Sequence, residues 1–342
     1  MGGQTHTNTP MKKILNQASD YVDEMLEGMV LAHGDIYAQP ERRVITRSAG
    51  AQPGKVGLVT GGGSGHLPIF AGYVGKGLLD AASIGDVFAS PSAEQMATAC
   101  RHASGGAGVL MIYGNYGGDV MNFGMASEVL ELEDNLQTTQ VLLADDVASA
   151  PPAEAAKRRG VAGMVYAFKI AGAAADERRN LAEVTHIARR AADACRSIGV
   201  ALTPCVVPRA GIPTFTLAEN EMEMGMGIHG EPGIWRAPLK SADAIMDEML
   251  DRLLADQPIV RGDHVSVLVN SLGATPPEEL YILYRRLCKR FQALGVEVVM
   301  PLVGRYATSM EMTGATLTLC HLDDELERLL KAPCHCAFWT VT

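Results

Sequence analysis

The chain reads VGLVTGGGSGH at residues 56–66, where a short apolar run is followed by four glycines, a serine and a histidine. An apolar run that ends in glycine is typical of a buried strand leading into a loop. Glycines leave backbone N–H groups open to an incoming ligand, and open α/β sheets bind ligands at the carboxyl ends of their strands. The stretch therefore predicts a strand over 56–60 and a ligand-binding loop over 61–66, with a plain tight turn as the alternative.

Neither glycine-rich segment of the chain matches a nucleotide-binding motif. A Walker A loop ends in Gly-Lys-Ser/Thr, whereas Gly65 is followed by His66. Residues 225–230 match G-x-G-x-x-G, but a turn over 230–233 follows where a dinucleotide site needs a helix. We therefore expect no nucleotide cofactor in this chain.

Outward from the loop, strands alternate with helices. Strands are predicted over residues 108–113 and 141–144, and helices over 13–33, 92–103, 120–132 and 176–198. This alternation favours a largely parallel sheet that is flanked by helices on both faces. A second alternation follows, with strands predicted over 202–207, 264–270 and 296–300, and helices over 242–254, 275–293 and 323–330.

The two alternations together predict an α/β fold with two domains, which suits a length of 342 residues. We assign residues 1–198 to a first α/β domain, which carries the glycine-rich substrate loop. Residues 199–342 are assigned to a second, smaller α/β domain, which carries His229.

Composition narrows the range of partners. The net charge of −10 gives a surface that repels phosphate backbones, which argues against nucleic acid as a partner. No apolar run approaches the roughly 20 residues of a membrane span, and the polar segment 1–13 lacks a signal core. The seven cysteines fit buried free thiols, and Cys334-His335-Cys336 lacks the second Cys/His pair of a zinc site. We therefore expect a cytoplasmic protein with no metal site.

Two further segments carry candidate site residues. Asp119 follows the strand over 108–113 and two glycines, where a carboxylate can act as a general base toward a hydroxyl, although a helix N-cap is the more common role. His229 is flanked by Gly227 and Gly230, which expose an imidazole to small ligands, although a lone histidine is more often structural.

Five segments resemble, in order along the chain, the dihydroxyacetone-binding subunit of the dihydroxyacetone kinases. They read GGGSGH at 61–66, NYGGDVMNF at 115–123, LLADDVAS at 142–149, ENEMEMGMGIHGEPG at 219–233 and NSLGATPPEELY at 270–281. The likeness extends over residues 11–339, and the fourth segment is the most specific of the five. The resemblance implies two α/β domains, a homodimer and ketose kinase activity.

By this resemblance, His229 is the covalent anchor, whose neutral ring nitrogen adds to the ketone carbon of the substrate and gives a hemiaminal. His66 would hydrogen-bond the substrate, and Asp119 would accept the proton of the attacking hydroxyl. The tether would fix the terminal hydroxyl for in-line attack, which favours transfer through positioning. The remaining hydroxyls would be held by Gly63, Ser64 and Gly65.

One departure from the family bears on the substrate. Many members carry Lys five residues before the Asp of their NYTGD segment, where it contacts the substrate, and this position is Gly114 here. The loss of an ammonium group removes a hydrogen bond and opens space beside the ligand. We therefore include Gly114 in the substrate site and expect a ketose larger than dihydroxyacetone, such as the four-carbon erythrulose.

A second departure bears on the phosphoryl donor. The single-chain kinases of the family append a helical nucleotide-binding domain, whereas this sequence stops soon after residue 330. The resemblance then implies a separate helical nucleotide-binding (L) subunit that holds Mg-ADP or Mg-ATP, with a phosphotransferase-system protein recharging the ADP form. Some relatives keep the ketone site but act as non-catalytic coactivators, and this is the alternative function; such a sensor needs His229 but not Asp119.

Overall fold

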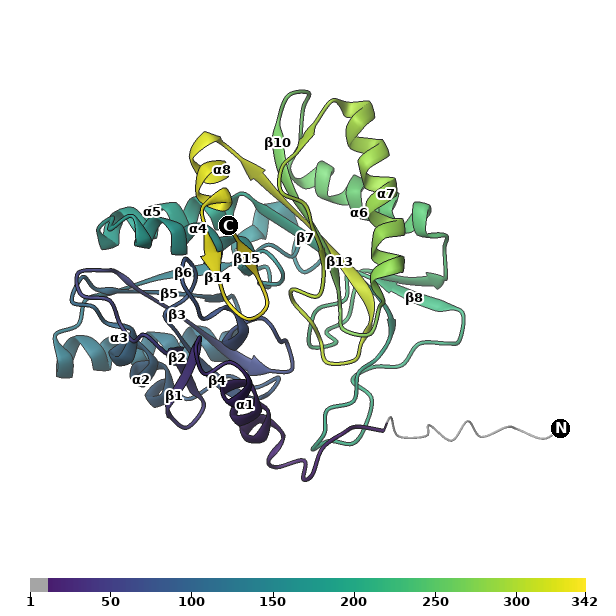
Figure 1. Ribbon diagram of the computed structural model, residues 1–342. Coiled ribbons are helices and arrows are strands. Elements are labelled where there is room, and N and C mark those ends of the chain that lie inside the picture. The colour runs from purple at the N-terminus through teal and green to yellow at the C-terminus, as the bar shows by residue number, and fades with distance from the viewer. Residues whose placement is uncertain (1–11) are drawn as a thin grey trace.

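The computed structural model describes residues 12–342, which form two sheets surrounded by helices (Figure 1). The first sheet has six strands in the order β1-β2-β4-β3-β5-β6. Strands β4, β3, β5 and β6 run parallel to one another. Strand β2 pairs antiparallel with both β1 and β4. The strands are β1 Tyr37–Glu41, β2 Val44–Arg47, β3 Gly57–Ser64, β4 Ala81–Val87, β5 Val109–Gly114 and β6 Thr138–Leu143.

Helices cover both faces of the first sheet because its strands are apolar on both sides. Val59 and Met111 pack with α2 (Ala93–Ala103) and α3 (Gly117–Asp134). Their sequence neighbours Leu58 and Leu110 point to the opposite face, as alternate residues of a strand do, and join one core with the other three helices. Those helices are α1 Tyr21–Ala32, α4 Met164–Asp176 and α5 Leu181–Asp193.

The second sheet is ordered β11-β10-β13-β7-β8-β9, with β12 also paired to β10. It is mostly antiparallel, and only β11 and β12 run parallel to β10. Figure 1 shows α6 (Ala242–Asp256) and α7 (Pro277–Leu294) on one face of this sheet, which they cover with a second core. The strands are β7 Cys195–Thr203, β8 Glu221–Met224, β9 Trp235–Pro238, β10 His264–Ser271, β11 Glu297–Val298, β12 Leu302–Gly304 and β13 Thr313–Leu322.

The remaining elements are short. They are α8 Asp324–Lys331, the paired strands β14 Cys334–His335 and β15 Thr340–Val341, and the 3-10 helices η1 Ala71–Tyr73 and η2 Pro152–Lys157. Together with the two sheets they confirm the predicted fold class, an α/β protein whose first sheet is largely parallel and flanked by helices.

Helix α4 lies between the two sheets, and the sequence analysis did not predict it. All of its residues from Met164 to Ala175 are buried, so it has no polar face and no helical period to recognise. Its Tyr166 accepts a hydrogen bond from Ser266 of β10 at 3.1 Å, and its Lys169 donates to the carbonyl of Leu329 at 2.8 Å. Burial of Lys169 lowers the pKa of its ammonium to about 8. The helix thus contacts the first sheet through its apolar core and is held to β10 and α8 by hydrogen bonds.

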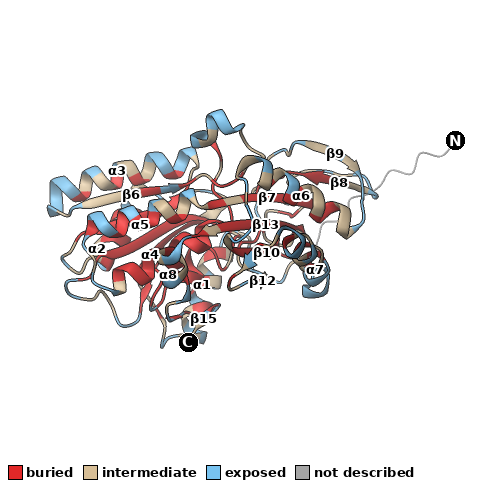
Figure 2. Ribbon diagram, turned by 90° about the horizontal axis from the view of Figure 1, so that it is seen from above, coloured by how far each residue is buried: buried red, intermediate tan, exposed pale blue. Residues whose placement is uncertain are grey.

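The division of the chain into two domains at residue 198 remains a proposal. Residue 198 lies within β7, which runs from Cys195 to Thr203 and belongs wholly to the second sheet. The C-terminal residues Leu326 and Trp339 pack in the core of the first sheet (Figure 2 shows the continuous buried layer). The chain therefore returns to the first sheet after completing the second.

The glycine-rich stretch is strand where the sequence analysis predicted a loop. Strand β3 continues to Ser64, and Gly61 and Gly62 pair with Ser83 and Ile84 of β4. Crowding explains the glycines, since a Cβ at Gly61 would lie 2.3 Å from Oγ of Ser83. Their backbones are therefore used by the sheet, and only the following residues of the segment are free to form the loop.

Among residues 12–342, every helix is too short or too polar to cross a lipid bilayer.

Replacing Gly62 with Ala should destabilise the fold, because the added Cβ would lie 2.2 Å from Cζ of the buried Phe70. We expect the free energy of unfolding, measured by urea denaturation, to fall by about 1–3 kcal/mol. Gly28→Ala is the matched control, since nothing lies within 4 Å of its Cβ position in α1. That variant should gain about 0.5–1 kcal/mol, and wild-type stability in Gly62→Ala would contradict the explanation.

Candidate active site

The predicted site residues come together where the two sheets meet. His66 follows β3, Gly114 ends β5 and Asp119 stands in the first turn of α3. Parallel strands end at the same edge of a sheet, so these three positions share one side of the first sheet. His229 approaches from the second sheet, on the segment that follows β8.

Aromatic rings enclose the imidazole of His229. The ring centroids of His66 and Tyr116 each lie 4.7 Å from it, and that of Phe88 lies 5.2 Å away. All three rings stand nearly perpendicular to the His229 ring, at 83–89°. The imidazole is therefore held in one orientation, and the two histidines that the sequence analysis selected are in direct contact.

Glu231 determines which nitrogen of His229 is available for chemistry. Its Oε1 lies 2.9 Å from Nδ1 of His229, and its Oε2 accepts the backbone N–H of the same residue at 2.9 Å. Burial alone would raise the pKa of Glu231, but the hydrogen bond and charge of His229, together with Arg159, lower it to about 2. An ionised carboxylate only accepts hydrogen bonds, so in the neutral ring Nδ1 carries the proton and Nε2 keeps its lone pair.

His66 is fixed in the same tautomer by a backbone carbonyl. Its Nδ1 donates to the carbonyl of Thr308 at 2.7 Å, so Nε2 is an acceptor. Burial first, and then the nearby charge of His229, lowers the pKa of His66 to about 3, so the ring is neutral at physiological pH. Met310 also donates from its backbone N–H to the carbonyl of Gly65 at 2.7 Å, which ties the loop to the second sheet.

Three buried polar atoms around His229 have no hydrogen-bond partner. They are Nε2 of His66, the hydroxyl of Tyr116 and Oδ1 of Asp119, which make up half of such side-chain atoms found among residues 12–342. Unpaired buried polar groups are rare and costly, because each has given up its hydrogen bonds to water. Their gathering around one imidazole therefore marks a place where a polar ligand would supply the partners.

Asp119 is a buried carboxylate within the first turn of α3 and is not the cap of that helix. The N-cap of α3 is Tyr116, and Asp119 lies three residues further into the helix with its side chain 5% exposed. Burial raises the pKa of Asp119 to about 6, although Ser90 and the charge of His229 act in the opposite direction. A carboxylate with this pKa is ionised at pH 7 and is a stronger base than an ordinary aspartate.

Gly114 does not leave open space as the sequence analysis expected. A Cβ at this position would lie 3.0 Å from Cε2 of Tyr116, because the ring of Tyr116 packs against the glycine. The structure thus fills the place beside Gly114 with an aromatic ring that carries a free hydroxyl.

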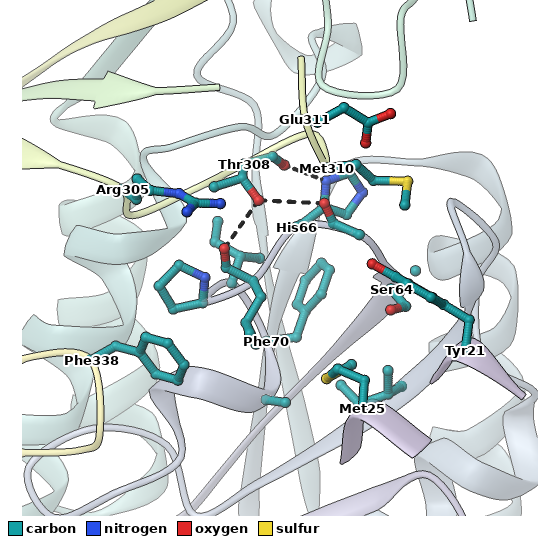
Figure 3. Close-up of a pocket in the computed structure, with 17 residues that line it drawn as sticks. Tyr21, Met25, Ser64, His66, Phe70, Arg305, Thr308, Met310, Glu311 and Phe338 are labelled. Carbon is teal, nitrogen blue, oxygen red and sulfur yellow. Dashed lines mark hydrogen bonds between the residues drawn. The ribbon is translucent and has the colours of Figure 1, made fainter. Parts of the chain in front are cut away.

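The remaining predicted residues line a neighbouring cavity of about 580 Å³ (Figure 3). Gly63, Ser64, Gly65 and His66 form one wall of this cavity, together with residues of α1 and of the C-terminal segment. His229, Asp119 and Gly114 are not among its lining residues. His66 is therefore the predicted residue that both borders this cavity and contacts His229.

Sequence reasoning missed Tyr116, Glu231 and Phe88 as residues of the site. Tyr116 and Glu231 lie within quoted motif segments, but their sequence positions do not show that their side chains turn toward His229. In the part of the chain that the structure describes, no three His, Cys, Asp or Glu side chains gather as metal ligands would.

Comparisons with known proteins show the family of this chain. The Dak1 domain family matches residues 27–338. The dihydroxyacetone-binding subunit DhaK of the PEP-dependent dihydroxyacetone kinase of Escherichia coli K12 is 42% identical over 349 residues, which cover 95% of this chain and 98% of that protein. The L-erythrulose kinase of Pectobacterium atrosepticum is 44% identical over 327 residues, which cover 94% of this chain and 55% of that protein.

A solved structure bears on the alternative function. The dihydroxyacetone kinase operon co-activator Dha-DhaQ superimposes with a TM-score of 0.86 at 31% sequence identity, covering 95% of this chain and 99% of that one. Proteins that resemble this chain over nearly its whole length thus include both a kinase subunit and a co-activator by name.

Replacing Glu231 with Ala should release the tautomer of His229. Without the carboxylate at Nδ1, the neutral ring is expected to shift toward the Nε2–H form, which nitrogen chemical shifts of the imidazole would report by NMR. The control is Glu219→Ala, an exposed carboxylate in the same segment, which should leave the ring as it is in the wild type. An unchanged Nδ1–H tautomer in Glu231→Ala would contradict the role of this contact.

Proposed function

This chain belongs to the Dak1 domain family, and from this premise we propose that it is the ketose-binding subunit of a dihydroxyacetone-type kinase. It would bind a short-chain ketose as a hemiaminal on His229 and present a terminal hydroxyl to a separate phosphoryl-donor subunit. The single observation that carries the proposal is the group of three unpartnered polar atoms around an imidazole whose Nε2 is free.

The tether follows from the tautomer of His229. The Nε2 lone pair adds to the carbonyl carbon, the C=O π electrons move to the oxygen, and the oxygen takes up a proton from water. The ring acquires positive charge in this step, and the Glu231 carboxylate at Nδ1 stabilises that charge at 2.9 Å. A polyol such as glycerol has no carbonyl and cannot be captured in this way.

Asp119 and His66 suit the phosphoryl-transfer step. The terminal hydroxyl oxygen attacks phosphorus, its proton goes to the Asp119 carboxylate, and the donor's leaving oxygen keeps the electron pair. The free Nε2 of His66 would accept a hydrogen bond from the bound ketose and help to orient it. Gly63, Ser64 and Gly65 would contribute to the same hydroxyl contacts from the loop side of His66.

The donor would be a helical nucleotide-binding (L) subunit with Mg-ADP or Mg-ATP, which supplies the cations that stabilise transferring phosphoryl groups. A phosphotransferase-system protein would recharge the ADP form, as the name of the PEP-dependent relative suggests. We further propose that the chain works in the cytoplasm as a homodimer.

A four-carbon ketose such as erythrulose is the substrate we favour. Gly114 replaces the lysine that many relatives carry, and a relative at 44% identity is named an L-erythrulose kinase. The alternative function, a dihydroxyacetone-sensing coactivator without catalysis, is supported by the similarity to Dha-DhaQ. Asp119 favours the kinase, because binding alone requires no base.

Replacing Asp119 with Asn should separate binding from catalysis. With the donor subunit present, kcat is expected to fall by about 10²–10⁴-fold, while intact-mass analysis after trapping should still show the ketose adduct. His229→Ala should lose that adduct.

In the wild type, kcat should decline as the pH drops below about 6, because the Asp119 carboxylate, whose pKa is raised to about 6, becomes protonated there and can no longer accept a proton. Full turnover in Asp119→Asn would refute the assigned role.

The substrate can be tested directly by steady-state kinetics. We expect kcat/KM for at least one enantiomer of erythrulose to exceed that for dihydroxyacetone, because the site has a free hydroxyl in place of an ammonium group near Gly114. A clear preference for dihydroxyacetone over both enantiomers would count against the four-carbon assignment.

A further inference from the structure

Tyr116 occupies an unusual place in the site. Its ring packs on Gly114, where a Cβ would approach Cε2 to 3.0 Å and Cδ2 to 3.2 Å. The opposite neighbour is His229, at 4.7 Å between ring centroids and 89° between ring planes. A side chain at position 114 would meet the ring at these distances, so the ring would have to shift slightly to admit it.

The hydroxyl of Tyr116 is a hydrogen-bond donor with nothing to donate to. The oxygen is buried and has no partner. Burial, together with the negative charge of Glu231, raises the pKa of this phenol well above its ordinary value, so it keeps its proton. A buried hydroxyl without a partner is unfavourable, because it has lost its water and gained no replacement. Packing against Gly114 and His229 explains the place of the ring but not its hydroxyl, since phenylalanine would pack equally well.

The other unpartnered atoms of the site already have roles at the hydroxyl that is phosphorylated. In the proposed function, Asp119 would accept its proton; we assign the hydrogen bond from the ketose to His66 to this same arm. A ketose bound through its carbonyl carbon has two arms, and the second arm needs its own polar partner. Tyr116 is the remaining unpartnered group in contact with His229.

We propose that Tyr116 is a specificity-determining residue, whose phenol donates a hydrogen bond to a hydroxyl on the ketose arm that is not phosphorylated. The inference rests on the proposed function, because it assumes a ketose held at His229. A neutral donor in a closed site suits an uncharged polyhydroxy arm, and a hydroxyl on a stereocentre next to the carbonyl would give it a means to distinguish enantiomers.

Binding of two ketones to the isolated chain tests the inference without any partner subunit. Erythrulose carries hydroxyls on its second arm, whereas 1-hydroxybutan-2-one has the same carbon skeleton and lacks them. Isothermal titration calorimetry would give the dissociation constant of each ketone for the wild type and for Tyr116→Phe, which removes one oxygen and keeps the ring. We expect erythrulose to bind about five- to tenfold more weakly to the variant, with less than a twofold change for 1-hydroxybutan-2-one.

A neighbouring tyrosine supplies the matched control. Tyr113→Phe removes a hydroxyl that donates a hydrogen bond to Gln140, and it keeps the ring that stacks on Phe123. This variant should leave the ratio of the two dissociation constants unchanged. Circular dichroism and thermal unfolding would establish that both variants are folded.

The outcomes separate this inference from the proposed function. Equal weakening of both ketones in Tyr116→Phe, or no weakening of either, would overturn the role of the phenol even if the His229 adduct forms. Failure of the wild type to form any ketone adduct at His229 would instead overturn the tether. In that case the assignment of Tyr116 to the second arm would fall with the tether, because the arms are defined by the ketose held at His229.

Discussion

Two hydrogen bonds donated by Nδ1 atoms set up the chemistry of this site. His66 donates to the carbonyl of Thr308, and His229 donates to the carboxylate of Glu231. Neither acceptor carries a hydrogen, so both rings hold their proton on Nδ1 and present a lone pair at Nε2. A ring in the other tautomer would offer an N–H, which can neither add to a carbonyl nor accept from a hydroxyl. The surrounding structure therefore specifies the protonation pattern as well as the position of each ring.

This arrangement requires both sheets to be correctly placed. His66 follows β3 of the first sheet, but its acceptor Thr308 lies between β12 and β13 of the second. Helix α4 is buried between the sheets: it packs in the core of the first sheet, and its Tyr166 and Lys169 form hydrogen bonds to β10 of the second sheet and to α8. Packing that fixes α4 thus also fixes the distance between His66 and its partner. The C-terminal segment also packs against the first sheet, because Trp339 lies in the core of that sheet.

The sequence was informative wherever function and local pattern coincide. His66 and Asp119 stand beside glycines at the ends of predicted elements, and His229 beside glycines between two of them. The structure brings the two histidine rings into contact and places Asp119 close enough for the charge of His229 to lower its pKa. Side-chain directions were beyond reach, because the turn of Glu231 back to His229 depends on tertiary packing. The local pattern predicts a loop for the glycines of β3, because they follow directly on a short apolar run. Their actual cause is crowding from residues distant in sequence, such as Phe70, which no local pattern contains.

The state of Asp119 bears on whether such a site evolved to bind or to react. A carboxylate that is 5% exposed and leaves Oδ1 without a partner destabilises the folded chain, by about 1–3 kcal/mol for a typical unpaired buried group. A sensor that only tethers a ketone gains nothing from this group, and an asparagine or serine would satisfy a ligand hydroxyl at lower cost. A base must instead be poorly solvated, since desolvation is what raises its proton affinity. The burial of this carboxylate therefore supports the proposal that Asp119 serves proton transfer and not recognition alone.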